Sequence, residues 1–235
     1  MDESEKLVAQ FLAYKGFQKI FYEPDGNIPP DFLVDGRIAV EVRRLNQNVT
    51  SKNGNFEGLE ETAIPLWHKV NKLVLSMGLS LNQESWFVCI DFHRPVDSWK
   101  KLESKIRLAL NIFRRNPSRS NCTLIISPSF QIDILRAGKV HDTFFLMGGS
   151  SDDDSGGWVL AEIEKNLKLC VAEKREKIKH VRSKYDEWWL VLPDHIGYGL
   201  DEIDKEQFRE SISLEHDWDK VILLDPRNHT RWFEI

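Results

Sequence analysis

Two acidic residues near the start of the chain have a spacing that suits metal or acid-base chemistry. Asp31 and Glu41 flank an Asp35-Gly36 turn signal, and the arm that contains Glu41 alternates apolar and polar residues at the two-residue period of a strand. The two acids are therefore expected on adjacent arms of a β-hairpin, near the same level. Carboxylates held together repel each other unless a divalent cation or a proton lies between them. The spacing predicts a site of that kind.

The loop of the hairpin decides whether the two acids share a face. A strict two-residue turn at Asp35-Gly36 would pair Asp31 with Val40. The acids would then lie on opposite faces, because directly opposed residues share a face. A three-residue loop or a bulge, with Gly36 at positive φ, restores a common face. We therefore expect an irregular hairpin.

The residues around this hairpin resemble the PD-(D/E)XK nuclease superfamily. Pro30-Asp31 is followed ten residues later by Glu41, and then by Val42 and a basic residue, Arg43. The resemblance covers about forty residues, and beyond them only the order of helices and strands. It implies that Asp31, Glu41 and the carbonyl of Val42 bind Mg²⁺, with Mn²⁺ as a substitute. The implied function is a nuclease that hydrolyses phosphodiester bonds, with DNA as the first expectation.

The family pattern has a lysine two residues after the second acid, where this chain has Arg43. Arginine stabilises phosphoryl charge but does not deprotonate at accessible pH, which argues against a role as a base. Lys174 is centred on the apolar stripe of a long helix expected over about 158–185. Some branches of the superfamily carry the catalytic lysine on such a helix, so the resemblance implies that Lys174 could replace the missing lysine. The alternative is a Lys174 that reaches solvent or forms a structural ion pair.

A further acid, Glu5, lies at the edge of the apolar stripe of a helix expected over residues 3–15. Its spacing from Asp2 predicts a capping box at the start of that helix. The resemblance implies a second role, as an acid on the first helix that faces the metal site. The two interpretations are compatible.

These residues need a scaffold that brings the hairpin and a distant helix together. The expected order is a helix over 3–15, a strand over 17–22, the two arms of the hairpin, the helix over 158–185 and a buried strand over 188–193. The predicted fold class is α/β, with a mixed central β-sheet flanked by helices and an α-β-β-β-α-β core that resembles restriction endonucleases. We expect one domain over 1–235, with core residues 1–45 and 158–235 and a large insertion at 46–157.

The insertion is expected to contain a helix and a linker. A helix is expected from about Pro65 to Met77, with Pro65 in its first turn, where the missing N–H costs nothing. The run Asp152-Asp153-Asp154 lacks the ligand spacing of a calcium loop and indicates a linker.

The charge of the chain restricts how it could bind nucleic acid. Lys and Arg number 32 against 37 Asp and Glu, a net charge of -5, so contact with a polyanion requires a local patch. The basic segments 94–119 and 165–184 are the expected contacts with nucleic acid, for which the resemblance implies DNA. The alternative for 94–119 is a solvated helix face.

Composition indicates the class of protein and its compartment. Hydrophobic residues make up 41% of the chain, which supports a packed core. No run approaches eighteen apolar residues, and the first residues are acidic, so we expect no membrane contact and no export. Cys89, Cys122 and Cys170 are set among apolar residues, which indicates buried reduced thiols and a cytoplasmic location.

The rival hypothesis is a catalytically inactive module on the same scaffold that binds nucleic acid or protein. In that case Arg43 marks a degenerated site, and an Arg43 paired with Glu41 would block the metal. A structural or assembly protein is a third, weaker alternative. The sequence also leaves open a homodimer that cuts two strands.

Overall fold

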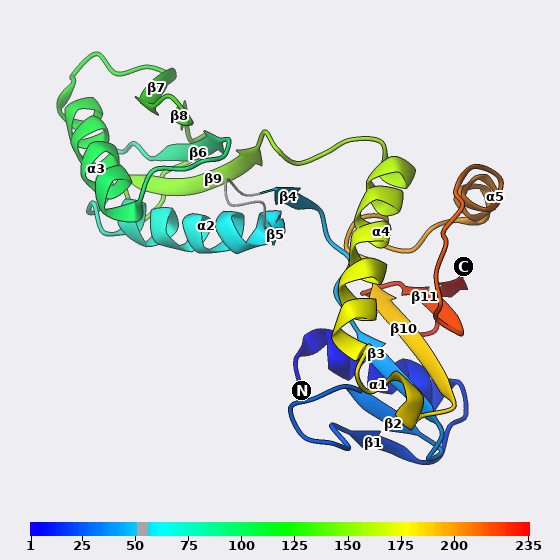
Figure 1. Cartoon of the computed structure of the whole chain (residues 1–235). Coiled ribbons are helices and arrows are strands. Elements are labelled where there is room, and N and C mark those ends of the chain that lie inside the picture. Colours follow the sequence, from blue (N-terminus) through cyan, green and yellow to red (C-terminus); the bar gives the residue numbers. More distant parts are fainter. Residues whose placement is uncertain (51–55) are drawn as a thin grey trace. The chain divides into compact units, whose positions relative to one another are not determined.

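The computed structural model describes residues 1–50 and 56–235 of the chain. The chain forms two compact units, each described here by itself: unit 1 comprises Met1–Asn48 and Gly157–Ile235, and unit 2 comprises Val49–Gly156. The fold is mixed α/β, with mixed β-sheets flanked by helices (Figure 1). Within the described residues, no helix has the length and apolar character needed to cross a membrane.

Unit 1 is built on a six-stranded sheet with the order β1-β2-β3-β10-β11-β12. The three strands β3, β10 and β11 run parallel, and the remaining neighbours are antiparallel. The elements of unit 1 are α1 (Glu3–Tyr14), β1 (Ile20–Tyr22), β2 (Phe32–Val34), β3 (Ile38–Val42), α4 (Val159–Ile178), a 3₁₀ turn (Arg182–Lys184), β10 (Glu187–Pro193), α5 (Glu202–Ser211), β11 (Lys220–Leu224) and β12 (Trp232–Glu234).

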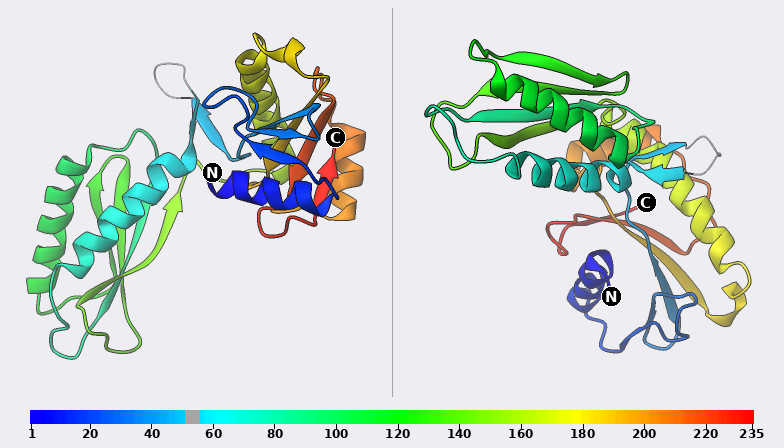
Figure 2. Two further views of the ribbon diagram at one scale, coloured as in Figure 1. Left: turned by 90° about the horizontal axis from the view of Figure 1, so that it is seen from below. Right: turned by 90° about the vertical axis from the view of Figure 1, so that its left-hand side faces the viewer.

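Helices cover both faces of this sheet. Helix α1 packs on one face through Val8, Phe11 and Leu12, against the side chains that β3 turns that way, Val40 among them. Helix α4 packs on the opposite face, against Ala39 and the core of β10 (Figure 2). Because side chains alternate along a strand, Glu41 points to the same face as Ala39, toward α4.

The hairpin of β2 and β3 has the three-residue loop that the parity argument requires. Phe32 pairs with Val40 and Val34 pairs with Ile38, so three residues close the loop. Asp35 and Gly36 both have positive φ, at 51° and 75°. The same register, carried one residue further, sets Asp31 opposite Glu41, and the two acids share the face that α4 covers. The prediction of an irregular hairpin is confirmed.

Unit 2 has a four-stranded sheet with the order β7-β8-β6-β9, in which β6 and β9 are parallel. One face of this sheet packs against both helices of the unit, and this core is separate from the two cores of unit 1 (Figure 2). Its elements are α2 (Leu59–Leu75), β6 (Trp86–Phe92), α3 (Trp99–Arg115), β7 (Cys122–Ser127), β8 (Phe130–Arg136) and β9 (Phe145–Asp152). Two short strands, β4 (Asn48–Thr50) and β5 (Phe56–Gly58), pair with each other.

Two predicted helix boundaries are wrong. Helix α2 starts at Leu59, so Pro65 lies inside the helix and not in its first turn. The first turn is stabilised by Glu61, whose carboxylate accepts a hydrogen bond from the Gly58 N–H, and burial of Leu59 and Leu66 on one face offsets the bond that Pro65 cannot donate. Helix α4 ends at Ile178 and is followed by a 3₁₀ turn, so it is shorter than the expected 158–185.

The run Asp152-Asp153-Asp154 is more than a linker, which corrects a second expectation. Asp152 closes strand β9, and its two carboxylate oxygens accept hydrogen bonds from Arg94 at 2.7 and 2.8 Å. Asp154 accepts a further bond from the same guanidinium at 3.1 Å. The run therefore fixes the end of β9 to the loop after β6. The expectation of three buried thiols holds only for Cys170, because Cys89 and Cys122 are partly exposed, although all three are free.

Candidate active site

The structure brings Asp31, Glu41 and Lys174 together on the face of the unit 1 sheet that α4 covers. The Lys174 Nζ donates a hydrogen bond to Glu41 Oε2 at 2.6 Å and lies 3.7 Å from Asp31 Oδ2. Asp31 Oδ2 also accepts the backbone N–H of Val42 at 2.6 Å. Three groups from two arms of a hairpin and a helix far along the chain thus converge on one point.

Glu41 is the most deeply buried member of this cluster, with 0% of its surface exposed. Lys174 compensates its charge at Oε2, but no donor among the described residues reaches Oε1, which is also buried. A buried carboxylate oxygen without a partner carries the full penalty of its lost hydration. The Glu41 carboxylate is therefore stabilised at Oε2 and keeps an unsatisfied acceptor, Oε1, in the protein interior.

A second lysine, Lys177, also reaches Glu41, although helical periodicity did not predict it at the site. Its Nζ lies 3.3 Å from Glu41 Oε2. Burial opposes the charged form of Lys177, but the negative charges of Glu41 and Asp31 outweigh it and raise the pKa of Lys177 above its ordinary value. Three residues advance a helix by about 300°, so Lys177 lies about 60° from Lys174. Lys177 is too far from the centre of the apolar stripe of α4 for periodicity to place it at the site. The i, i+3 spacing of Lys174 and Lys177, which puts both lysines on one side of the helix, was the signal that could have indicated it.

Arg43 lies at the same site but is not paired with Glu41. Its Nε and one terminal nitrogen contact Glu173 Oε2 at 3.1 and 2.9 Å, so a residue of α4 compensates its charge. A direct ion pair between Arg43 and Glu41 would block a cation at Glu41. The described contacts of the two residues include no such pair. Arg43 instead lies at the rim of the site.

Glu5 forms the predicted capping box. It accepts the Asp2 N–H at 2.6 Å, while Asp2 accepts the Glu5 N–H at 2.8 Å. The Tyr22 hydroxyl also donates to Glu5 Oε2 at 2.9 Å, which ties the start of α1 to β1. The cap does not remove Glu5 from the site, because its side chain lines the same cavity as Asp31.

A cavity of about 580 Å³ opens onto Asp31 and the two lysines, whereas the fully buried Glu41 is not among the residues that line it. It lies wholly within unit 1. The residues that line it come from the start of α1, from the hairpin and from α4: Asp2, Glu3, Ser4, Glu5, Asp31, Val42, Arg43, Arg44, Lys174 and Lys177. Both signs of charge meet here, since acids from α1 and the hairpin face cations from β3 and α4.

The donor set fits a hard divalent cation. Mg²⁺ is commonly held by one or two carboxylates and keeps several waters, and Asp31 and Glu41 supply two carboxylates, one with an unpartnered oxygen. The carbonyl of Val42, the third expected ligand, belongs to a residue that lines the cavity. Across residues 1–50 and 56–235, no cluster of three or more His, Cys, Asp or Glu side chains is arranged to hold a metal. Any cation here would therefore rely on two side chains.

Most cations of the basic segment 94–119 have partners inside unit 2. Arg94 is held by Asp152, and Arg119 by Glu84 at 2.7 Å, and both guanidiniums are largely buried. Lys105 and Arg107 pair with acids on or beside α3. The described contacts include no acidic partner for Lys100, Lys101 or Arg115. The surface that this segment offers to a polyanion is thus much smaller than its composition suggests.

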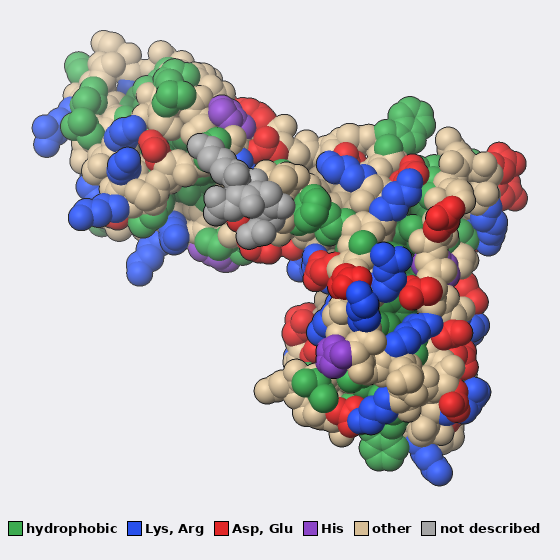
Figure 3. Space-filling model, viewed as in Figure 1, with side chains coloured by type: hydrophobic (Ala, Val, Ile, Leu, Met, Phe, Trp, Pro, Cys, Tyr) green, Lys and Arg blue, Asp and Glu red, His purple; other side chains and the backbone are tan. Residues whose placement is uncertain are grey.

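The basic segment 165–184 is also largely compensated. Four of its exposed lysines pair with acids one turn away on α4 or with the loop after β1: Lys165 with Glu162, Lys168 with Glu164, Lys179 with Glu176 and Lys184 with Asp25. Figure 3 accordingly shows basic and acidic side chains intermingled over the face that α4 presents. Contact with nucleic acid through either segment stays a prediction.

Comparison of the chain with protein-family models, with curated proteins and with solved structures found no match in any of the three. The function of the chain is therefore inferred from the site itself.

Proposed function

We propose that this protein is a metal-dependent nuclease of the PD-(D/E)XK type that hydrolyses phosphodiester bonds of nucleic acid, with DNA as the first candidate. One observation carries the proposal: Lys174 from α4 meets Asp31 and Glu41 from the hairpin within hydrogen-bonding and ion-pairing distance, in the interior of the protein. A buried carboxylate with an unpartnered oxygen reduces stability, which is the behaviour expected of a functional group.

The order of elements supports the same proposal. In unit 1, α1 is followed by the antiparallel strands β1, β2 and β3, and then by α4 and β10, with β10 parallel to β3. The order matches the α-β-β-β-α-β order expected of a restriction-endonuclease-like core, with unit 2 between β3 and α4. Fold does not fix function, so the order only adds weight to the chemistry of the site.

The residues have distinct roles under this proposal. Asp31, Glu41 and the Val42 carbonyl would hold Mg²⁺ or Mn²⁺. Such a cation lowers the pKa of a bound water and neutralises charge on the scissile phosphate. Lys174 orients the attacking water and stabilises the charge that develops on the phosphoryl oxygens. Arg43, at the rim, contacts a substrate phosphate, and Glu5 acts as an outer acid that orients the other groups.

A cleavage assay tests the proposal directly. The purified protein is incubated with single- and double-stranded DNA and RNA in Mg²⁺ or Mn²⁺, and we expect cleavage of at least one substrate. Asp31→Asn and Glu41→Gln should each reduce the rate by roughly a hundredfold or more, the scale for loss of a group that acts on transition-state charge. Asp35→Asn is the matched control, because Asp35 lies in the same hairpin, outside the residues that line the cavity, and should retain full activity.

The rival function is a nucleic-acid- or protein-binding module without catalysis. The observation in its favour is that Glu41 Oε2 already faces two ammonium groups, Lys174 and Lys177. Binding of nucleic acid without cleavage in either cation, unchanged in Asp31→Asn, would favour the rival and exclude the nuclease.

A further inference from the structure

The two lysines at Glu41 differ in how firmly they are held. Lys174 and Lys177 both face Glu41 Oε2, at 2.6 and 3.3 Å. The Lys174 side chain is only 8% exposed and also faces Asp31, whereas the Lys177 side chain is 46% exposed. One ammonium is thus enclosed by protein, and the other bridges the interior and solvent.

The charges of this cluster balance without any metal ion. Asp31 and Glu41 supply two negative charges, and Lys174 and Lys177 supply two positive charges within ion-pair distance of them. A divalent cation on the same carboxylates would add two positive charges that nothing in the cluster offsets. Like charges at such short separations repel strongly where water is largely excluded. A cation and both ammonium groups therefore compete for Glu41.

Lys177 is the group that can give way. Its side chain already reaches solvent, so a change of rotamer moves its ammonium into water without loss of hydration. Lys174 also lines the cavity, but its side chain is only 8% exposed and faces both acids, so moving its ammonium away from Glu41 costs more. Lys177 and Arg43 both line the cavity, so an ammonium that leaves Glu41 remains at the same cavity as Arg43.

We propose that Lys177 is a displaceable latch that couples cation binding to capture of a substrate phosphate. Without a cation, Lys177 holds Glu41; when a divalent cation binds the carboxylates, Lys177 turns outward and contacts a phosphate of the nucleic acid. The site thereby gains affinity for a polyanion only after the cation has bound. This inference rests on the proposed function, because it assumes that Asp31 and Glu41 bind the cation.

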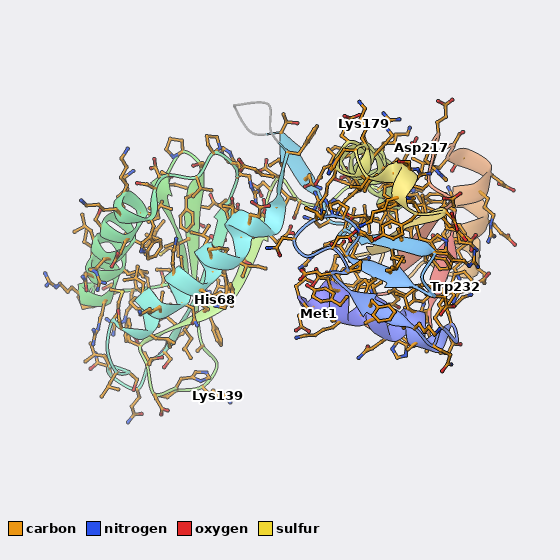
Figure 4. All side chains as sticks on the ribbon, turned by 60° about the horizontal axis from the view of Figure 1, so that its bottom comes forward. Met1, His68, Lys139, Lys179, Asp217 and Trp232 are labelled. Atoms are coloured by element: carbon orange, nitrogen blue, oxygen red, sulfur yellow. The ribbon has the colours of Figure 1, made fainter. Side chains whose placement is uncertain are left out.

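Calorimetric titration with Ca²⁺ and Mn²⁺ tests the first half of the proposal. Lys177→Gln removes the competing charge, so its cation affinity should exceed that of the wild type by about tenfold, near the lower end of typical couplings between ligands. The matched control is Lys179→Gln on the same helix, which removes an exposed lysine paired with Glu176 at the end of α4 (Figure 4). The control should bind cations as the wild type does.

Binding of labelled oligonucleotides tests the second half. In Ca²⁺, Lys177→Gln should bind a DNA duplex or its RNA counterpart at least about fivefold more weakly than wild type and Lys179→Gln, in spite of its tighter cation binding. Without divalent cations the three proteins should bind equally weakly. Opposite effects of one substitution on the two ligands would not arise from a general loss of structure.

Each contrary result has a separate meaning. If the wild type binds cations and Lys177→Gln binds them no more tightly, the latch is wrong while the proposed function stands. If cation affinity rises but oligonucleotide binding is unchanged, Lys177 does not contact phosphate and the coupling is wrong. If the wild type binds no cation, or Asp31→Asn binds as tightly as the wild type, the proposed function fails and the latch fails with it.

Discussion

At the scale of single residues, the main feature is a buried carboxylate whose two oxygens have opposite surroundings. Glu41 is compensated at Oε2 and lacks a partner at Oε1. Removing two charges from water is costly, and their mutual attraction repays that cost only when the geometry and the remaining hydrogen bonds are complete. Here they are incomplete at Oε1, so the Glu41–Lys174 pair is not optimised for stability, as expected under the proposed function.

The incomplete pairing of Glu41 predicts that a single substitution lowers the free energy of unfolding more than a double substitution does. Lys174→Met leaves Glu41 buried with only the more distant Lys177, and should reduce the free energy of unfolding of unit 1 by about 3 to 5 kcal/mol. The double variant Glu41→Gln with Lys174→Met removes both charges and should recover most of that loss. Native-state hydrogen exchange of the β3 and β10 amides reports unit 1 by itself. A loss below about 1 kcal/mol in Lys174→Met would mean that Glu41 reaches water, contrary to its burial.

At the scale of elements, the hairpin and the helix were predictable for different reasons. The loop of the hairpin follows from parity, because only an odd number of loop residues places Asp31 and Glu41 on one face. Lys174 follows from helical periodicity, since a charge at the centre of an apolar stripe needs a partner. The hairpin and Lys174 were predictable because the periodicities of a strand and of a helix are local properties that do not depend on the tertiary structure.

The contacts that remained unpredicted are those between elements. The pairing of Arg43 with Glu173 depends on how α4 lies against β3, and the reach of Lys177 to Glu41 depends on side-chain length and not on periodicity. Helix ends were missed at α2 and α4 because capping and burial overrode the local signals of Pro65 and of the apolar stripe. The fold class could thus be derived from the sequence, but only part of the site.

The loop of the hairpin offers a test at this scale. Gly36 has φ of 75° and open space around its Cα, so a side chain there meets backbone strain and no clash. Asn tolerates this conformation and Val does not, so Gly36→Val should destabilise unit 1 by about 1 to 2 kcal/mol more than Gly36→Asn. The free energies of unfolding of the two variants, compared by hydrogen exchange of β2 and β3, check the prediction. Equal values would mean that the loop does not hold residue 36 at positive φ.

At the scale of the whole molecule, the chain forms two units with separate hydrophobic cores. The core of unit 2 is made by α2, α3 and one face of its own sheet, and no described residue of unit 1 belongs to it. All residues of the proposed site lie in unit 1. The proposed site and the inserted sequence therefore belong to different units of the chain.

Each unit should fold without the other. Residues 49–156 expressed alone should give a dispersed amide NMR spectrum and a cooperative urea transition, because their core is complete. A chain in which a flexible linker of about ten residues replaces 49–156 should keep the wild-type affinity of the Asp31–Glu41 site for Mn²⁺. A shortened chain that folds but has lost this affinity would show that unit 2 contributes to the site.

The pairing of β3 with β10 has a consequence for how the protein is made. The ribosome completes β3 long before it reaches Glu187, the first residue of β10, because all of unit 2 and α4 are synthesised in between. At usual rates of translation the interval is on the order of ten seconds. During this time the edge of β3 that faces away from β2 has no partner strand. Unit 2 is synthesised in full within that interval. Its folding shortens the unfolded loop between β3 and β10, and so lowers the entropy cost of pairing the two strands. Pairing of β10 with β3 thus covers an aggregation-prone strand edge, and the same folding step brings Asp31 and Glu41 together with Lys174 and Lys177.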